Sequence, residues 1–138
     1  MIGVFELAEV IDEKMTTFSK GMKQKVVAIA ALIHNPDVLF LDEPLNGLDV
    51  NAALILKGVI RDLASKGKTI FFSSHILEVV ERICDRVAII DRGQIIKEGR
   101  VTDLMKMANE STLEAVFRDL TAETDYTREV KAFVEALG

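Results

Sequence analysis

Two acidic residues and a histidine stand just after apolar runs, where their side chains could do chemistry. Asp42 and Glu43 follow Val38–Leu41, and His75 follows Thr69–Ser73. A carboxylate at a strand end can hold magnesium through water. Its neighbour points differently and could polarise an attacking water, while a histidine suits a terminal phosphate. Together, these three tasks would serve the hydrolysis of a phosphate bond. Alternatively, the two acidic residues simply begin a surface loop, and the single histidine is structural.

A second segment, Ser19–Met22, has residues that suit an anion. Ser19 is a hydroxyl N-cap for the helix that follows, and Gly21 would let a phosphate approach the backbone closely. Free N–H groups and the helix dipole attract negative charge at such a terminus. An ordinary capped helix with a tolerated glycine has the same pattern. Further along, Asn46–Asp49 is a turn by composition.

Two strands must position the acids and the histidine. The continuous apolar run Val38–Leu41 is typical of a strand buried on both faces of a parallel sheet, and Thr69–Ser73 is predicted as a second buried strand. Ligands of such sheets bind at the carboxyl ends of the strands. Asp42, Glu43 and His75 are therefore expected to meet at one edge.

The other elements complete an α/β pattern. Residues 2–11 could be the tail of a helix that starts outside the chain. Thr102 and Ser111 look like N-caps, the latter in a capping box with Glu114. We also expect a helix from Ser19 to about His34, helices over Asn51–Lys66, Ile76–Cys84 and Thr127–Leu137, and a hairpin of Arg86–Ile90 with Gln94–Lys97.

Composition narrows the class of protein. The 138 residues suffice for one domain with a core. The net charge of −5, from 22 acidic and 17 basic residues, argues against a nucleic-acid surface. A single cysteine, Cys84, favours a reducing cytoplasm. The longest apolar run, Val26–Ile33, is too short to span a bilayer, and acidic residues crowd the N-terminus, unlike a signal peptide.

The order of the motifs resembles the C-terminal portion of an ATP-binding-cassette (ABC) transporter ATPase. Phe18–Met22 (FSKGM) resembles the signature motif, Val38–Glu43 the Walker B strand, Asn46–Asp49 the D-loop, and His75 the switch histidine. The tail STLEAVFRDLT resembles that of bacterial exporter ATPases. The chain departs from the family's LSGGQ signature, with Lys20 for the first glycine and Met22 for the glutamine.

The resemblance implies an α/β, P-loop NTPase-like fold with a mainly parallel sheet flanked by helices. The sheet would be incomplete, because the N-terminal half of the cassette is missing, and a small helical tail would follow. Residues 1–100 would be the C-terminal part of the nucleotide-binding domain, including the end of the helical subdomain and the signature helix in 1–35. Residues 101–138 would be a C-terminal helical extension.

The resemblance also implies a division of roles, with ATP and magnesium as cofactors. Two cassettes of this family enclose two ATP molecules, each resting on one subunit's phosphate loop beneath the other's signature helix. Glu43 and His75 would be catalytic and Asp42 would hold the metal, all serving an ATP that the missing half binds. The residues that would contact nucleotide are Ser19, Lys20, Gly21, Met22 and Asp49. Those of the signature motif would serve a partner's ATP.

The chain contains no GxxxxGK[ST] phosphate loop, and the Q-loop and the base-stacking aromatic strand are missing too. Phosphoryl transfer depends on positioning and charge neutralisation, so we expect little or no hydrolysis by this chain alone. The intact parent would hydrolyse ATP to drive a membrane permease, with efflux the favoured direction. Its partners would be a second cassette subunit and the permease, without nucleic acid, and its location cytoplasmic, on the inner face of the cell membrane.

Two other interpretations remain open. One is a non-enzymatic half-cassette that pairs with a complete ATPase, which the absent phosphate loop favours. The other is a DNA-maintenance ATPase, which usually carries long coiled coils and basic surfaces that this chain does not show. Met1 could be a true start or the edge of a truncation. With the first strands of the sheet missing, an exposed edge and apolar surface would favour self-association or domain swapping.

Overall fold

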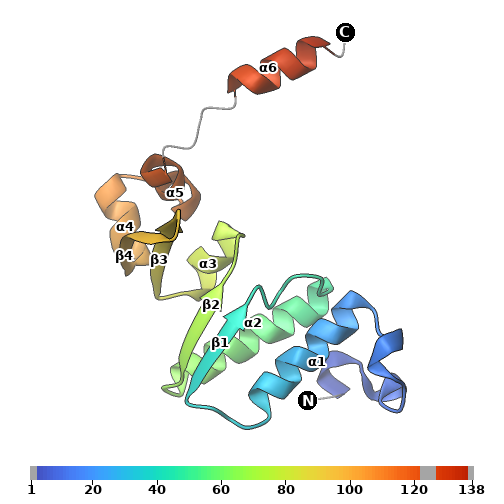
Figure 1. The fold of residues 1–138 in the computed structure, drawn as a ribbon. Coiled ribbons are helices and arrows are strands. Elements are labelled where there is room, and N and C mark those ends of the chain that lie inside the picture. The colour runs from blue at the N-terminus through green and yellow to red at the C-terminus, as the bar shows by residue number, and fades with distance from the viewer. Residues whose placement is uncertain (1–2, 122–126, 137–138) are drawn as a thin grey trace. The chain divides into compact units, whose positions relative to one another are not determined.

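The computed structural model describes residues 3–121 and 127–136 (Figure 1). The chain divides into two compact units, Met1–Val79 and Val80–Gly138, and the boundary falls inside helix α3 (Leu77–Ile83). Each unit has its own short sheet: a parallel pair in the first and an antiparallel pair in the second.

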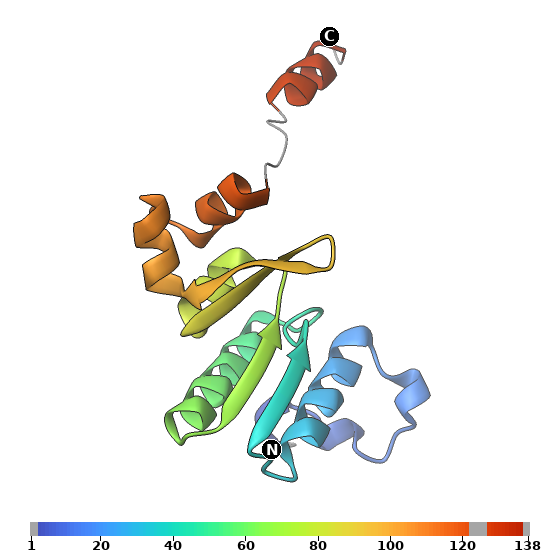
Figure 2. The same ribbon diagram turned by 60° about the vertical axis from the view of Figure 1, so that its left-hand side comes forward.

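The first unit is built on a parallel strand pair joined by a helix. Strands β1 (Val38–Asp42) and β2 (Thr69–Ser73) pair in register from Val38↔Thr69 to Asp42↔Ser73. Helix α2 (Val50–Ser65) connects them, and α1 (Lys20–Leu32) precedes them. In both views α2 lies behind β2, and α1 lies to the right of β1 (Figures 1 and 2).

Local sequence signals explain the bounds of α2. Asp49 is its N-cap, with the side chain accepting a hydrogen bond of 2.8 Å from the backbone N–H of Ala52. Buried positions recur every fourth residue at Ala52, Leu56 and Ile60, so one stripe of the helix faces the core. After the helix, Gly67 adopts a φ of +86°, a left-handed conformation that glycine adopts at little cost. The predicted positions of this helix and of α1 are confirmed within two residues.

The prediction that β1 is buried on both faces is wrong. Leu39 and Leu41 are buried, whereas Val38, Phe40 and Phe71 of the opposite face are 50%, 73% and 55% exposed. The rings of Phe40 and Phe71 stack on this face with centroids 4.6 Å apart. A continuous apolar run thus identified the strand correctly, while only one of its faces is covered by the described residues.

We predict that the isolated chain self-associates through this apolar face, because water leaves such a surface when two copies meet. Light scattering over a concentration series should give a mass above that of one chain. The double substitution Phe40→Lys with Phe71→Lys should lower that mass, because lysine charges on the face oppose contact. A monodisperse monomer for the unaltered chain would contradict this prediction.

The second unit contains the predicted hairpin. Strands β3 (Arg86–Asp91) and β4 (Gln94–Arg100) pair antiparallel. Arg92 and Gly93 connect them with φ values of +48° and +79°, the two positive angles of a type I′ turn. Helices α4 (Val101–Ala108) and α5 (Leu113–Thr121) follow, and a small core forms from Ile89, Leu104 and Val116. Helix α6 spans Thr127–Ala136.

Three terminus predictions need correction. Thr102 lies inside α4, whose N-cap is Arg100 without a side-chain bond. The hydroxyl that caps α5 belongs to Thr112 rather than Ser111, and it accepts from Ala115 N–H at 3.2 Å. Glu114 is not in a capping box but lies 3.6 Å from Arg118 one turn on.

The N-terminal segment also differs from expectation. Where we predicted the tail of a helix, the chain makes two 3₁₀ turns, Gly3–Phe5 and Ala8–Val10, and a third follows at Met15–Thr17. Phe5 and Leu7 are buried, so core contacts rather than helix periodicity organise this segment. Residue 2 and Leu137 lie outside the described residues. Within the described part of the chain, no helix has both the length and the apolar character that a membrane crossing needs.

Candidate functional site

The register of the parallel pair brings the predicted acidic residues and histidine to one edge. Asp42 and Ser73 are the last paired residues of β1 and β2. Glu43 follows β1 directly, and His75 is the second residue after β2. The Ser73 hydroxyl donates to Asp42 Oδ1 and accepts from Glu43 N–H at 3.1 Å. Ser73 was not singled out from the sequence, although its place at a strand end was visible there. Its hydroxyl links the two carboxylate residues to the neighbouring strand.

Glu43 and His75 contact each other directly. The backbone N–H of His75 donates to Glu43 Oε1 at 2.9 Å, and His75 Nδ1 lies 2.8 Å from the same oxygen. A carboxylate only accepts hydrogen bonds, so Nδ1 carries the proton in this contact. Glu43 has a φ of +44°, an uncommon conformation for a residue with a side chain, and such strain tends to occur at functional sites. Both contacts use Oε1, and Glu43 Oε2 can accept from a water.

The N-terminus of α1 lies against the turn Asn46–Asp49. The Ser19 hydroxyl accepts from Met22 N–H at 3.2 Å, which makes Ser19 the N-cap. Lys20 Nζ donates to Asn46 Oδ1 at 3.2 Å. A Cβ atom added to Gly21 would lie only 2.6 Å from the Gly47 carbonyl oxygen, so the two backbones touch where a side chain would not fit. The FSKGM segment therefore contacts the acidic turn through both side chain and backbone.

Asp49 is engaged in two ways. Besides capping α2, it pairs with Lys25 of α1 at 2.8 Å. The hydrogen bond from Lys25, and after it that from Ala52 N–H, holds the pKa of the Asp49 carboxyl below its ordinary value. Lys25 was not predicted from the sequence. The available signal was its place on the core face of α1, one turn before the buried Ala28.

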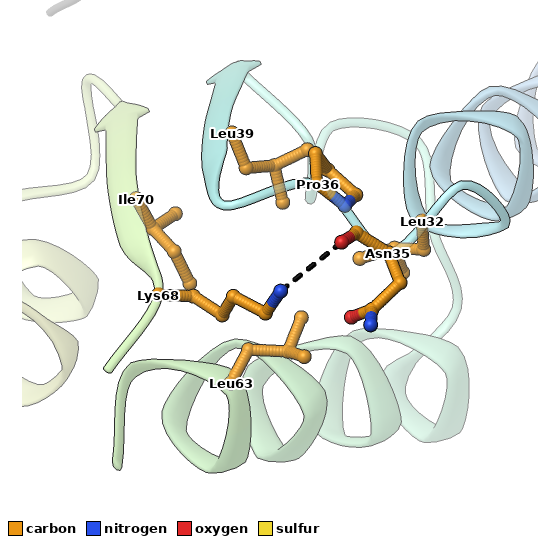
Figure 3. A pocket seen from close by; sticks show the side chains of 7 residues that line it. All are labelled: Leu32, Asn35, Pro36, Leu39, Leu63, Lys68 and Ile70. Carbon is orange, nitrogen blue, oxygen red and sulfur yellow. Dashed lines mark hydrogen bonds between the residues drawn. The ribbon is translucent and has the colours of Figure 1, made fainter. Parts of the chain in front are cut away.

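The one GK[ST] triplet of the sequence, Gly67-Lys68-Thr69, is not a phosphate cradle. It precedes β2 instead of following a strand, at the end opposite to Asp42. Lys68 Nζ donates to Asn35 O at 3.0 Å and to Asp37 Oδ1 at 2.9 Å (Figure 3). The pocket there has about 10 Å³ of enclosed volume, space for about one water. Its lining residues are Leu32, Asn35, Pro36, Leu39, Leu63, Lys68 and Ile70.

The donor set at the strand ends suits magnesium better than a metal that needs a complete protein cage. Among residues 3–121 and 127–136, no three His, Cys, Asp or Glu side chains gather as such a cage. Magnesium usually takes one or two protein carboxylates and completes its shell with waters and substrate phosphates. Asp42, with the Ser73 hydroxyl beside it, fits that requirement.

The chain is similar to ATP-binding proteins of ABC transporters and matches one family model. The model of a family described as "AAA domain, putative AbiEii toxin, Type IV TA system" matches residues 11–81, about half of the chain. An uncharacterised ABC transporter ATP-binding protein of Synechocystis, sll0415, is 39% identical over 91% of this chain. The linearmycin resistance ATP-binding protein LnrL of Bacillus subtilis is 38% identical over 78% of it. This chain spans 40% and 34% of those relatives' lengths.

A solved structure described as the ATP-binding subunit of an ABC transporter is similar to this one. It superimposes with a TM-score of 0.82 at 32% identity, over 87% of this chain and 51% of that chain. The α/β fold of this chain, with its parallel strand pair and flanking helices, therefore corresponds to about half of that subunit.

Proposed function

The chain belongs to the ATP-binding-cassette family of ATPases, and from this premise we propose that it supplies one half of an ATP-hydrolysing site, while another segment holds the ATP. The observation that carries the proposal is the gathering of Asp42, Glu43 and His75 at one end of β1 and β2. The only GK[ST] triplet lies at the other end and is bonded within the chain. The catalytic groups are thus present without a phosphate cradle.

The proposed chemistry assigns each residue a task. The Glu43 carboxylate accepts a proton from the attacking water, and His75 holds that carboxylate through its Nδ1–H and backbone N–H. Asp42 is the residue that would hold magnesium, which neutralises phosphate charge when bound. Ser19, Lys20, Gly21 and Met22 serve a partner's ATP from the N-terminus of α1. Asp49 lies in the turn beside these residues and contacts nucleotide at the same surface.

In the whole protein, we propose that this chemistry drives transport through a membrane permease from a position on the inner face of the cell membrane. A second cassette subunit would complete the pair of sites. Efflux is the favoured direction, because LnrL is named for resistance and other relatives, such as that of Rhizobium meliloti, for Nod factor export.

A non-enzymatic half-cassette is the second candidate. The absence of a GxxxxGK[ST] loop from the sequence favours it. Such a chain would cover an ATP on a complete partner subunit with its α1 terminus and would leave Glu43 unused.

We predict that ATP binding depends on a second subunit. Equilibrium dialysis with magnesium and ATP should detect binding to the chain alone only above about 1 mM, because most of the affinity comes from the phosphate cradle. Adding the chain to a complete ABC subunit should tighten that subunit's ATP binding. Micromolar ATP binding by the chain alone would contradict the proposed division of the site. Tightening without any Glu43-dependent hydrolysis would favour the half-cassette.

A further inference from the structure

Helix α1 touches the loop Glu43–Asp49 at four successive points. Two of them are described above: Lys20 contacts Asn46, and Gly21 abuts Gly47. In addition, Gln24 Nε2 donates to the backbone carbonyl of Glu43 at 3.4 Å, and Lys25 pairs with Asp49 at 2.8 Å. The loop that carries Glu43 is therefore fastened along its whole length to the first turns of α1.

Lys25 differs from the other contacts in its burial. Its side chain is 11% exposed, against 54% for that of Asp49, and Lys25 is the only charged residue found buried in the described part of the chain. A buried ammonium needs a partner, because an unpaired charge out of water is costly. The aliphatic part of the Lys25 side chain therefore packs in the core. Its buried ammonium group is compensated only while Asp49 stays paired with it.

We propose that Lys25 is a positioning residue that acts through Asp49 to hold the Glu43–Asp49 loop against α1. Asp49 is fixed at both sides, by Lys25 on α1 and by Ala52 N–H on α2. From Asp49 the loop runs back to Glu43 through short turns, with Asn46 N–H bonded to Glu43 O at 3.0 Å and Leu48 N–H to Leu45 O at 3.2 Å. Loss of the Lys25–Asp49 ion pair would therefore free the Asp49 end of this series of hydrogen bonds.

The consequence rests on the proposed function. Ser19–Gly21 would meet an ATP held by a partner subunit, while Glu43 would serve an ATP held by the missing half. The four contacts join these two positions inside one compact unit. Movement of the α1 terminus on nucleotide binding would thus shift the backbone of Glu43, which couples the two sites.

The structural part is tested on the chain itself by NMR, with Lys25→Met, Lys25→Arg and the matched control Lys23→Met from the same helix. Lys25→Met should increase amide exchange at Asn46 and Leu48 by about tenfold and move the Asp49 titration up to its ordinary pKa. Lys25→Arg should restore both values, because arginine keeps the charge. Lys23→Met should match the unaltered chain. Unchanged exchange in Lys25→Met, with Asp49 still low, would overturn the proposal.

A second variant covers the case in which Lys25→Met unfolds. Asp49→Asn removes the ion pair but keeps a good N-cap for α2, so exchange should rise in the loop and stay low at Leu56 of α2. Unchanged loop exchange in this variant would also overturn the proposal. When the chain is joined to a phosphate-loop half, Lys25→Met should lower kcat with little change in KM for ATP. A change in KM alone would overturn the coupling, whereas an inactive unaltered fusion would count against the proposed function and leave the exchange result standing.

Discussion

Glu43→Gln is expected to lower ATP turnover by about 10²–10⁴-fold once this chain is joined to a segment that holds ATP. A glutamine amide keeps the size of the side chain but cannot accept a proton from the attacking water. The measurement is steady-state phosphate release by a chimaera in which residues 1–138 follow the N-terminal half of an ABC ATPase that carries a GxxxxGK[ST] loop. The loss should fall on kcat and not on KM, because Glu43 acts on the water during the chemical step.

The matched control for this change is Glu9→Gln, the same substitution in the 3₁₀ turn Ala8–Val10. It should leave turnover within about twofold of the unaltered chimaera, since surface substitutions away from a site have small effects. Turnover that survives Glu43→Gln at more than about a tenth of the original rate would remove Glu43 from the role of general base.

Gly21→Ala is expected to destabilise the first unit by about 1–3 kcal/mol. The new methyl group would lie 2.6 Å from the carbonyl oxygen of Gly47, a backbone atom that cannot move aside like a flexible side chain. The strain would push α1 from the loop and weaken the contacts of Lys20 and Gln24. Urea unfolding followed by helical circular dichroism measures the change in the free energy of unfolding.

Gly58→Ala provides a control of opposite sign. Gly58 is also a helical glycine, in α2, but a Cβ atom there meets nothing within 4 Å. Alanine is the better helix former by about 0.5–1 kcal/mol, so this substitution should stabilise the chain. If Gly21→Ala stabilised the chain as Gly58→Ala does, then α1 and the turn Asn46–Asp49 would not be in contact in solution.

Signals that are local in sequence predicted the elements well. Ser19 was predicted as the N-cap of a helix, and Arg86–Ile90 was predicted to form a hairpin with Gln94–Lys97. The structure has both, because α1 begins directly after Ser19 and β3 pairs with β4. The meeting of Glu43 with His75 followed from a general rule about parallel strands, and the structure has this contact. The catalytic and binding roles assigned to these residues remain predictions.

Features that depend on distant parts of the chain could not be read in the same way. An apolar run at β1 gives no information on whether a second layer covers Phe40, which is exposed. The pairing of Lys25 with Asp49 joins residues far apart in sequence, so a lysine among apolar neighbours was the sole hint. At α5 the hydroxyl of Thr112, the residue after the predicted Ser111, caps the helix.

The structure shows contacts of Lys20 that its place in the signature motif did not predict. The lysine replaces a glycine of the family signature, and its charge suggested direct contact with phosphate. In the structure its stem lies against Gly47, with carbon atoms 3.4 Å from the position of an added Cβ, and its ammonium group binds Asn46. Lys20 thereby strengthens the attachment of α1 to the loop.

The most direct test of the central claim is ATP turnover by the purified 138-residue chain, beside its Glu43→Gln variant. The claim is that the chain supplies Glu43, His75 and the α1 terminus, while the phosphate cradle comes from another segment. The account predicts that phosphate release by the chain and by the variant is the same and does not exceed that of ATP without protein. Turnover by the chain alone that is abolished by Glu43→Gln would contradict it.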